Sequence, residues 1–256
     1  AILALLASTV VSASDGMLDS PITAETALAV PVRITRLSVS SSGEQGNGYS
    51  LAPSISADAR YVVFESDATN LVAGDTNNTG DIFLRDRQTG ITTLVSLSST
   101  GQQANDYSYW ATISGDGCFV IFTSAATNLV NGDENDMEDV FIRDRLAGTT
   151  TLVSVASDGT QGNDFSGPGI SLSANSRYVA FDSDATNLVN GDTNETGDIF
   201  LRDLQAGITT RISLASDGTE ANGGSWGPSI SSDGRYVAFN SGASNLVPND
   251  TNEKTD

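Results

Sequence analysis

The sequence repeats itself every 58 or 59 residues, and this period constrains the fold more than any other feature. The Asp that opens an acidic loop recurs at spacings of 58, 59 and 58, and an upstream Asn recurs at spacings of 58, 58 and 59. The two landmarks are Asp75, Asp133, Asp192 and Asp250, and Asn47, Asn105, Asn163 and Asn222. Two independent landmarks with one period indicate tandem structural units.

Each repeat divides into four strand candidates. In the first repeat they are the segment around Ile55, the RYVVF segment from Arg60, the DIFLRD segment 81–86 and the ITTLVSL segment 91–97. Both faces of these strands are largely apolar, as expected when each sheet lies between two neighbours. No stretch shows a helical period.

Four short antiparallel strands per repeat, arranged around an axis, form a propeller blade. A β-sandwich is the alternative, but it would not require a 58-residue period. The predicted fold is therefore an all-β β-propeller of about four repeats, spanning residues 32–256.

The segments SSDGRYVAF and DIFLRD resemble the TolB-type, WD-like propeller repeat, and the resemblance covers roughly residues 33–256. It implies the fold only, because this repeat occurs in secreted and periplasmic proteins of unrelated roles. The ATNLVxGDxN insertion between the second and third strands departs from the shortest members of the family.

Counting strands predicts a fragment of a larger ring. The segment Val32–Ser40 matches the fourth strand of later repeats, three full units follow, and the last repeat reaches Asp256, where its third strand should begin. Propellers have about 4 to 8 blades, so a parent protein would need up to roughly 460 residues at this period.

The N-terminal segment AILALLASTVVSASDG resembles the end of a secretory signal peptide, with Val11 and Ala13 placed as in a cleavage site. We interpret residues 1–13 as a signal-peptide remnant and 14–31 as a linker. The apolar run is too short to span a bilayer as written. The prediction is a secreted protein, either extracellular, periplasmic or at the cell surface.

Composition excludes several functions. A net charge of -20 and a pI near 4.1 argue against nucleic acid and against anionic membranes, which need clustered Lys and Arg. The chain has no histidine and one cysteine, Cys118, which removes Ser-His-Asp and Cys-His catalysis and internal disulfides. Acids repeated identically in each unit suit a blade better than an active site, so we expect no enzyme.

The two long connections of each repeat should share one face, because strands in a blade alternate in direction. The first carries an acidic loop with the pattern D-x-N-x-x-x-D. Ca²⁺ takes six to eight oxygen ligands, so each loop is a candidate calcium site, whose alternative is simple Asx-turn chemistry. The candidate ligands are Asp75, Asn77, Thr79, Asp81, Asp133, Asn135, Asp139, Asp192, Asn194, Thr196, Asp198, Asp250 and Asn252.

Two other repeated features receive structural interpretations. Arg85 and Asp86, with their equivalents in later repeats, are predicted to form a buried ion pair that pins the third strand or a neighbouring blade. Cys118 occupies the position of Arg235 and is interpreted as drift at a turn.

The aromatic residues of the other long connection break the repeat. They differ between units: Tyr49; Tyr107, Tyr109 and Trp110; Phe165; and Trp226. Aromatic platforms beside Asp and Asn can hold a sugar, and Tyr107, Tyr109, Trp110, Phe165 and Trp226 are the candidate ligand-binding residues. The alternative is that they pack over the blade ends.

The leading hypothesis is a secreted, calcium-stabilised propeller that binds a protein or a glycan through this loop face. The alternatives are a structural element of a surface assembly, with self-association, and the propeller domain of an enzyme whose catalytic domain lies outside these residues.

Overall fold

A computed structural model of the chain describes residues 3–4, 34–252 and 254–256. This part of the chain contains strands, turns and loops and no helix. None of it therefore forms an apolar helix long enough to cross a membrane.

Three antiparallel sheets of four strands account for most of the described chain. We call them blades 1 to 3, and the two-stranded sheet that follows them blade 4. Blade 1 comprises β3 (Ser50–Ile55), β4 (Tyr61–Ser66), β5 (Asp81–Asp86) and β6 (Ile91–Leu94); blade 2 comprises β7 (Ser108–Ile113), β8 (Phe119–Ser124), β9 (Asp139–Asp144) and β10 (Thr149–Leu152); blade 3 comprises β11 (Ser166–Leu172), β12 (Tyr178–Ser183), β13 (Asp198–Asp203) and β14 (Ile208–Arg211); blade 4 comprises β15 (Ser225–Ile230) and β16 (Val237–Ser241).

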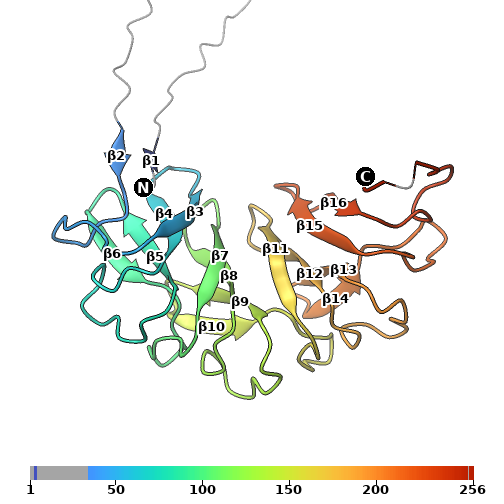
Figure 1. Cartoon of the computed structure of the whole chain (residues 1–256), viewed down its shortest axis with the longest axis horizontal. Helices are drawn as coiled ribbons and strands as arrows, with labels where there is room; N and C mark the ends of the chain where they lie inside the picture. Colours follow the sequence, from blue (N-terminus) through green and yellow to red (C-terminus); the bar gives the residue numbers. More distant parts are fainter. Residues whose placement is uncertain (1–2, 5–33, 253) are drawn as a thin grey trace, which may run out of the picture.

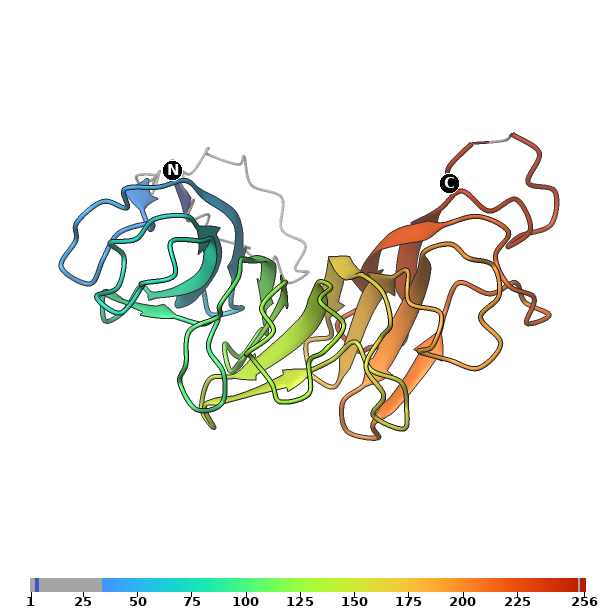
Figure 2. The same cartoon turned by 60° about the horizontal axis from the view of Figure 1, so that its bottom comes forward.

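The blades follow one another along an open arc (Figures 1 and 2). In Figure 1 the first strands β3, β7, β11 and β15 lie on the inner side of the arc, and β6, β10 and β14 lie on the outer side. Strand order in each full sheet is sequential. The predicted propeller with four-stranded blades is confirmed, and the sandwich alternative is wrong.

Strand boundaries differ from the prediction at the second and fourth strands: the second was predicted as RYVVF from Arg60, and β4 spans Tyr61–Ser66. The predicted third strand 81–86 is β5, with the same bounds, whereas the fourth was predicted over 91–97 and β6 ends at Leu94. The Val95 amide still donates to the Ile82 carbonyl, but the Leu97 amide turns back to the Val95 carbonyl, which ends the strand.

The segment before blade 1 was predicted as a strand over Val32–Ser40. Residues 32–33 lie outside the described part of the chain; within 34–40 the strand is β2 (Thr35–Arg36), which pairs with β1 (Leu3–Ala4). Thr92 Oγ1 of β6 donates to the Val39 carbonyl at 2.6 Å, so the segment packs where a preceding blade would. Apart from Leu3–Ala4, the predicted signal-peptide remnant and linker lie outside the described residues.

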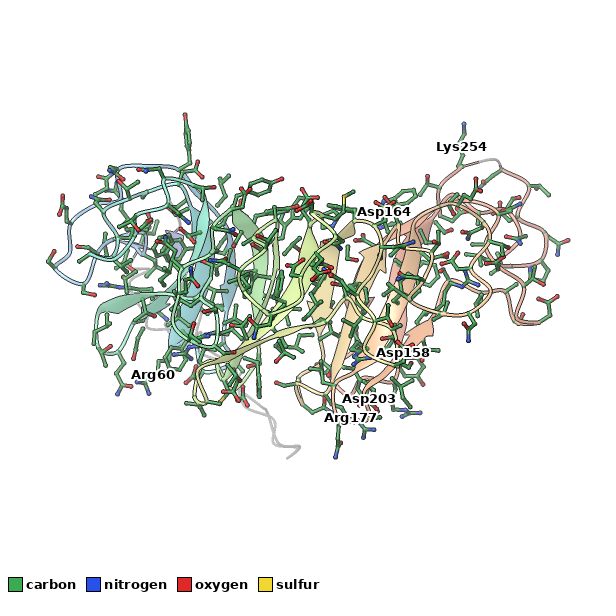
Figure 3. The ribbon with its side chains drawn as sticks, turned by 90° about the horizontal axis from the view of Figure 1, so that it is seen from below. Arg60, Asp158, Asp164, Arg177, Asp203 and Lys254 are labelled. Carbon is green, nitrogen blue, oxygen red and sulfur yellow. The ribbon has the colours of Figure 1, made fainter. Side chains whose placement is uncertain are left out.

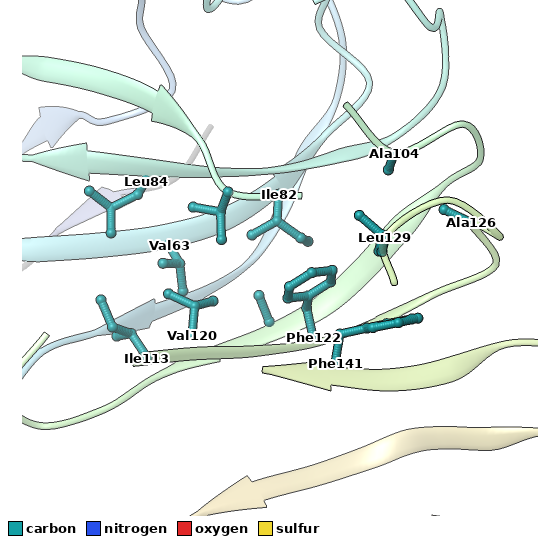
Figure 4. Close-up of a cluster of buried hydrophobic side chains, with 12 residues drawn as sticks. Val63, Ile82, Leu84, Ala104, Ile113, Val120, Phe122, Ala126, Leu129 and Phe141 are labelled. Carbon is teal, nitrogen blue, oxygen red and sulfur yellow. The ribbon is translucent and has the colours of Figure 1, made fainter. Parts of the chain in front are cut away.

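Hydrophobic cores lie between successive blades rather than within one. The core between blades 1 and 2 joins Val63, Ile82 and Leu84 to Val120 and Phe122, all at most 2% exposed (Figure 4). Each full blade also stacks a phenylalanine of its second strand on one of its third strand. The pairs are Phe64 with Phe83, Phe122 with Phe141 and Phe181 with Phe200. The second and third strands of the full blades are therefore largely buried on both faces, as their apolar pattern predicted, whereas β3 and the strands of blade 4 are exposed on one face.

Tyrosine and glycine fit together at two blade junctions. A Cβ added to Gly117 in blade 2 would lie 2.4 Å from the ring of Tyr61 in blade 1, and Gly234 stands in the same relation to Tyr178. At the junction of blades 2 and 3, Phe119 takes the place of the tyrosine and Ser176 takes the place of the glycine. The Ser176 hydroxyl is buried and makes no hydrogen bond. The turn residue is thus glycine where the preceding blade has a tyrosine and serine where it has a phenylalanine.

The predicted ion pair between Arg85 and Asp86 is wrong in its partners. Successive strand residues point to opposite faces, so Asp86 pairs with Arg60 at 2.8 Å while Arg85 Nη1 donates to the Ser40 carbonyl at 3.0 Å. Arg177 and Asp203 repeat the ion pair in blade 3. Both residues have structural roles: Asp86 closes a turn of its blade, and Arg85 binds the segment that precedes the blade.

Blade 2 lacks this ion pair because Cys118 stands where Arg60 and Arg177 stand. We expect Cys118→Arg to pair with Asp144 and to stabilise the protein by about 0.5 kcal/mol, the usual size for a partly exposed pair. Thermal unfolding in low salt should show a higher Tm than Cys118→Ser, and 0.5 M NaCl should reduce the difference. Equal Tm values for the two variants would show that the position contributes nothing through charge.

Candidate functional site

The two long connections of each blade meet on one face, as predicted. The Asn105 amide donates to Asn128 Oδ1 at 3.0 Å, and the Thr127 amide donates back to Asn105 Oδ1 at 3.0 Å. In Figure 3, Asp164 lies at this loop face, whereas Arg177 and Asp203 lie at the opposite face. The recurring Asn is therefore the residue that joins the two connections.

Asx turns shape all four acidic loops. In each, the Asn Oδ1 accepts the amide two residues further on, at 2.8–3.2 Å. The residues that accept in this way are Asn77, Asn135, Asn194 and Asn252. Turn chemistry, which was the alternative interpretation of the motif, is thus present in every loop.

A glutamine amide bridges the two carboxylates of the acidic loops in blades 1 and 2. Gln103 Nε2 donates to Asp75 Oδ1 at 3.0 Å and to Asp81 Oδ2 at 2.8 Å. In blade 2, Gln161 contacts Asp133 and Asp139 in the same way. Burial raises the pKa of Asp139 to about 6, while the hydrogen bonds from Ser154 and Gln161 favour its charged form.

Blade 3 reaches the same result with a charged pair. Glu220 replaces the glutamine, and Arg211 takes the position that Leu94 and Leu152 occupy in the earlier blades. Arg211 Nη1 lies 2.7 Å from a Glu220 oxygen, and the same atom lies 3.0 Å from Asp192 Oδ1 and 3.2 Å from Asp198 Oδ2. The guanidinium offsets the extra carboxylate that Glu220 brings.

The pairing of these two replacements can be tested in blade 2. Gln161→Glu should destabilise the protein by about 2 kcal/mol, because it replaces a donor with a third carboxylate beside Asp133 and Asp139. Adding Leu152→Arg should recover most of that loss. Urea unfolding of both single variants and the double variant measures the coupling, with Gln102→Glu as the matched control at an exposed site. If the effects of the two single substitutions on the free energy of unfolding simply add in the double variant, the glutamate and the arginine are not coupled.

These contacts identify what calcium would have to displace, and the calcium prediction itself stays a prediction. In the described part of the chain, no three His, Cys, Asp or Glu side chains gather closely enough to hold a metal ion. An ion between Asp75 and Asp81 would have to replace the Gln103 amide, and one in blade 3 would have to replace a cation.

If the acidic loops bind calcium, millimolar Ca²⁺ should raise the Tm of metal-free protein, and isothermal calorimetry should show a heat of binding. No heat and no shift in Tm would mean that the motif is turn chemistry only, because the loop carboxylates already have donors within the chain. Gln103→Ala removes the competing amide and is the sensitised control. A rise in Tm for the unaltered protein would establish calcium binding, since an ion that binds only the folded state stabilises it by mass action.

The aromatic residues line two pockets of the loop face. The first, of about 480 Å³, lies between blades 1 and 2, and the second, of about 630 Å³, is lined by residues of blades 2, 3 and 4. Tyr49, Tyr107, Tyr109 and Trp110 line the first pocket, and Trp110, Phe165 and Trp226 line the second. All five predicted ligand-binding residues thus lie in one or both pockets.

The three aromatic residues of blade 2 hold one another in place. The rings of Tyr107 and Tyr109 stack with centroids 5.4 Å apart, and Trp110 meets Tyr109 edge-on at 4.7 Å. Tyr107 Oη donates to Glu138 at 2.7 Å, and this hydrogen bond raises its pKa to about 12. Tyr109 is largely a packing residue, whereas the Trp110 side chain is 41% exposed and belongs to both pockets.

Trp110 also has a strained backbone. Its φ is +48°, at the β-bulge of β7; the first strands of the other blades have the same bulge with a positive φ, at Ala52, Gly167 and Gly227. A bulky residue rarely adopts this conformation, and bulges often redirect a side chain beside a functional site. The Trp110 amide donates to Glu65 of blade 1 at 2.9 Å, which fixes the bulge against the neighbouring blade.

The sequence missed the acids of these pockets. Glu65 and Asp67 line the first pocket, and Asp182 and Asp184 line the second. They lie at and just after the end of the second strand, where repeats 2 and 4 have Thr123 and Asn240 instead of an acid. This variation between repeats could have identified the pocket acids from the sequence. The sequence interpretation used the more regular acidic loops instead.

Comparison with known proteins agrees with the fold. No family model matches the chain, and no curated protein matches it. Similar solved structures include TolB from Acinetobacter baumannii, with a TM-score of 0.46 and 18% identity over 75% of this chain and 38% of that one. A putative TolB from Agrobacterium tumefaciens has a TM-score of 0.47 and 20% identity over 77% of this chain and 55% of that one.

The propeller domain of the Trilobed protease from Pyrococcus furiosus is also similar, with a TM-score of 0.41 and 10% identity over 64% of this chain and 41% of that domain. The chain therefore spans between about two fifths and just over half of these three structures. The matches are in line with the TolB-type resemblance of the repeat. At this level of similarity they carry no argument about function.

Proposed function

We propose that this chain is a non-enzymatic propeller module that binds a partner, protein or glycan, through its loop face. The observation that carries the proposal is the pair of neighbouring aromatic pockets, which share Trp110 and lie among loops fixed by hydrogen bonds. Concave sites with aromatic walls and a few placed polar groups are the usual form of a ligand site.

The arrangement of the acids supports binding over catalysis. The acids of the acidic loops in blades 1 to 3 contact donors of the chain itself. Histidine is absent from the sequence, so a general base would have to be one of the pocket carboxylates. The secreted or cell-surface location belongs to the same proposal and is supported by the N-terminal sequence pattern.

Trp110→Ala and Trp226→Ala should each weaken partner binding at least tenfold while lowering Tm by only a few degrees. Partially exposed aromatic side chains dominate binding energy when a ligand covers them, and both rings are more than 40% exposed here. Binding to a glycan array and to an immobilised library of secreted proteins provides the assay.

Tyr236→Ala is the matched control, because Tyr236 is an exposed aromatic that lines neither pocket. Its removal should leave binding intact. If the tryptophan variants lose stability and binding in proportion, the rings are packing residues and the proposal is wrong. If no partner is captured at all, the module is structural.

A further inference from the structure

The two pockets share a set of residues that the other repeats lack. Blades 1 and 3 both place an acid near the end of the second strand and an Asp two residues later. The pairs are Glu65 with Asp67 and Asp182 with Asp184, whereas blade 2 has Thr123 with Ala125 and blade 4 has Asn240 with Gly242. The acid pair thus occurs in the two blades whose second strands line a pocket.

A glycine accompanies each acid pair. A Cβ added to Gly80 would lie 3.1 Å from Asp67 Oδ1, and one added to Gly197 would lie 2.7 Å from Asp184 Oδ1. Blade 2 has Glu138 at this position, beside Ala125 in place of the Asp. The glycine leaves room for the second carboxylate of the pair at the pocket. The glycine and the acid pair therefore occur together in blades 1 and 3.

The two acids of each pair have different roles. The first acid holds the next blade: Glu65 accepts the Trp110 amide of blade 2 at 2.9 Å, and Asp182 accepts the Gly227 amide of blade 4 at 3.1 Å. Asp182 also accepts the Gly169 amide of its own blade at 3.0 Å. The second acids, Asp67 and Asp184, are exposed, and their carboxylates accept no hydrogen bond within the described part of the chain. Each pocket therefore offers one uncommitted carboxylate.

The surroundings of that carboxylate favour a cation. Aromatic rings line both pockets, and neither contains a lysine or an arginine. A cation over an aromatic face is attracted by the ring quadrupole, and a nearby carboxylate adds a charge-assisted hydrogen bond. The net charge of -20 adds long-range attraction for a basic partner.

We propose that each pocket takes one ammonium or guanidinium group, and that the partner is a basic segment of a protein carrying two such groups. This inference rests on the proposed binding function and specifies its ligand. Asp67 and Asp184 bind the two cations, and Trp110, which lines both pockets, lies between them. Because the pockets adjoin, both cations come from one stretch of the partner chain.

Tryptophan fluorescence tests the inference directly, because the chain has two tryptophans, Trp110 and Trp226, and both line the pockets. The probes are short Lys-Gly-Lys and Arg-Gly-Arg peptides, the same lysine peptide acetylated at both Nζ atoms, and neutral oligosaccharides. The basic peptides should change the emission saturably, and 0.5 M NaCl should weaken their binding. Acetylation should abolish the change.

Neutralising variants identify the carboxylates. Asp67→Asn and Asp184→Asn should each weaken binding of the basic peptides about fivefold, the upper range for one exposed ion pair. The double variant should weaken binding about 25-fold, because the effects of two separate sites add in free energy. The double variant Asp158→Asn with Asp217→Asn has the same change in net charge outside both pockets and should bind as the unaltered protein does.

The outcomes separate this inference from the proposed function. Equal responses to acetylated and free peptides, or undiminished binding by the Asp67 and Asp184 variants, would overturn the cationic ligand. Saturable binding of a neutral oligosaccharide that depends on Trp110 but not on the carboxylates would overturn it too, while supporting a binding function. Loss of binding in the charge-matched control would also contradict it, because general electrostatics would then explain the attraction.

Discussion

The packing of one sheet on the next is the interaction on which the rest of this structure depends. A four-stranded sheet with two apolar faces cannot be stable alone in water, so each blade completes the core of its neighbour. The cluster that joins Val63 and Ile82 of blade 1 to Phe122 of blade 2 is such a shared core. Loops that leave successive sheets are therefore held side by side.

The hydrogen bonds of the loop face make that proximity precise. The Asn105 hydrogen bonds join the two long connections. The Gln103 side-chain amide joins the two carboxylates of the acidic loop in blade 1. Glu65 and Asp182 then hold the first strand of the following blade through its backbone amides. The aromatic rings of the pockets therefore stand on a scaffold whose polar groups are largely hydrogen-bonded. The loops stay ordered although the rings are exposed to solvent.

The sequence predicted what the repeat controls and missed what varies within it. The period, the strand pattern and the turn residues predicted the blades and the shared face of the long connections, because each depends on local chemistry. The partner of Asp86 was wrong because strand alternation separates it from Arg85, and its true partner Arg60 lies 26 residues away. The roles of Gln103 and Arg211 depend on contacts between segments that no local pattern reveals.

The fit of Tyr61 against Gly117 bears on how a chain of similar repeats assembles correctly. Misassembly with the wrong neighbour is a characteristic failure of repeat proteins. The turn of blade 3 carries Ser176 where blade 2 has Gly117, and any side chain there would collide with the Tyr61 ring. Blade 3 therefore cannot replace blade 2 behind blade 1 without loss of packing, whereas blade 4, which also has a glycine at this turn, could. The junction thus excludes one wrong neighbour of blade 1 during assembly.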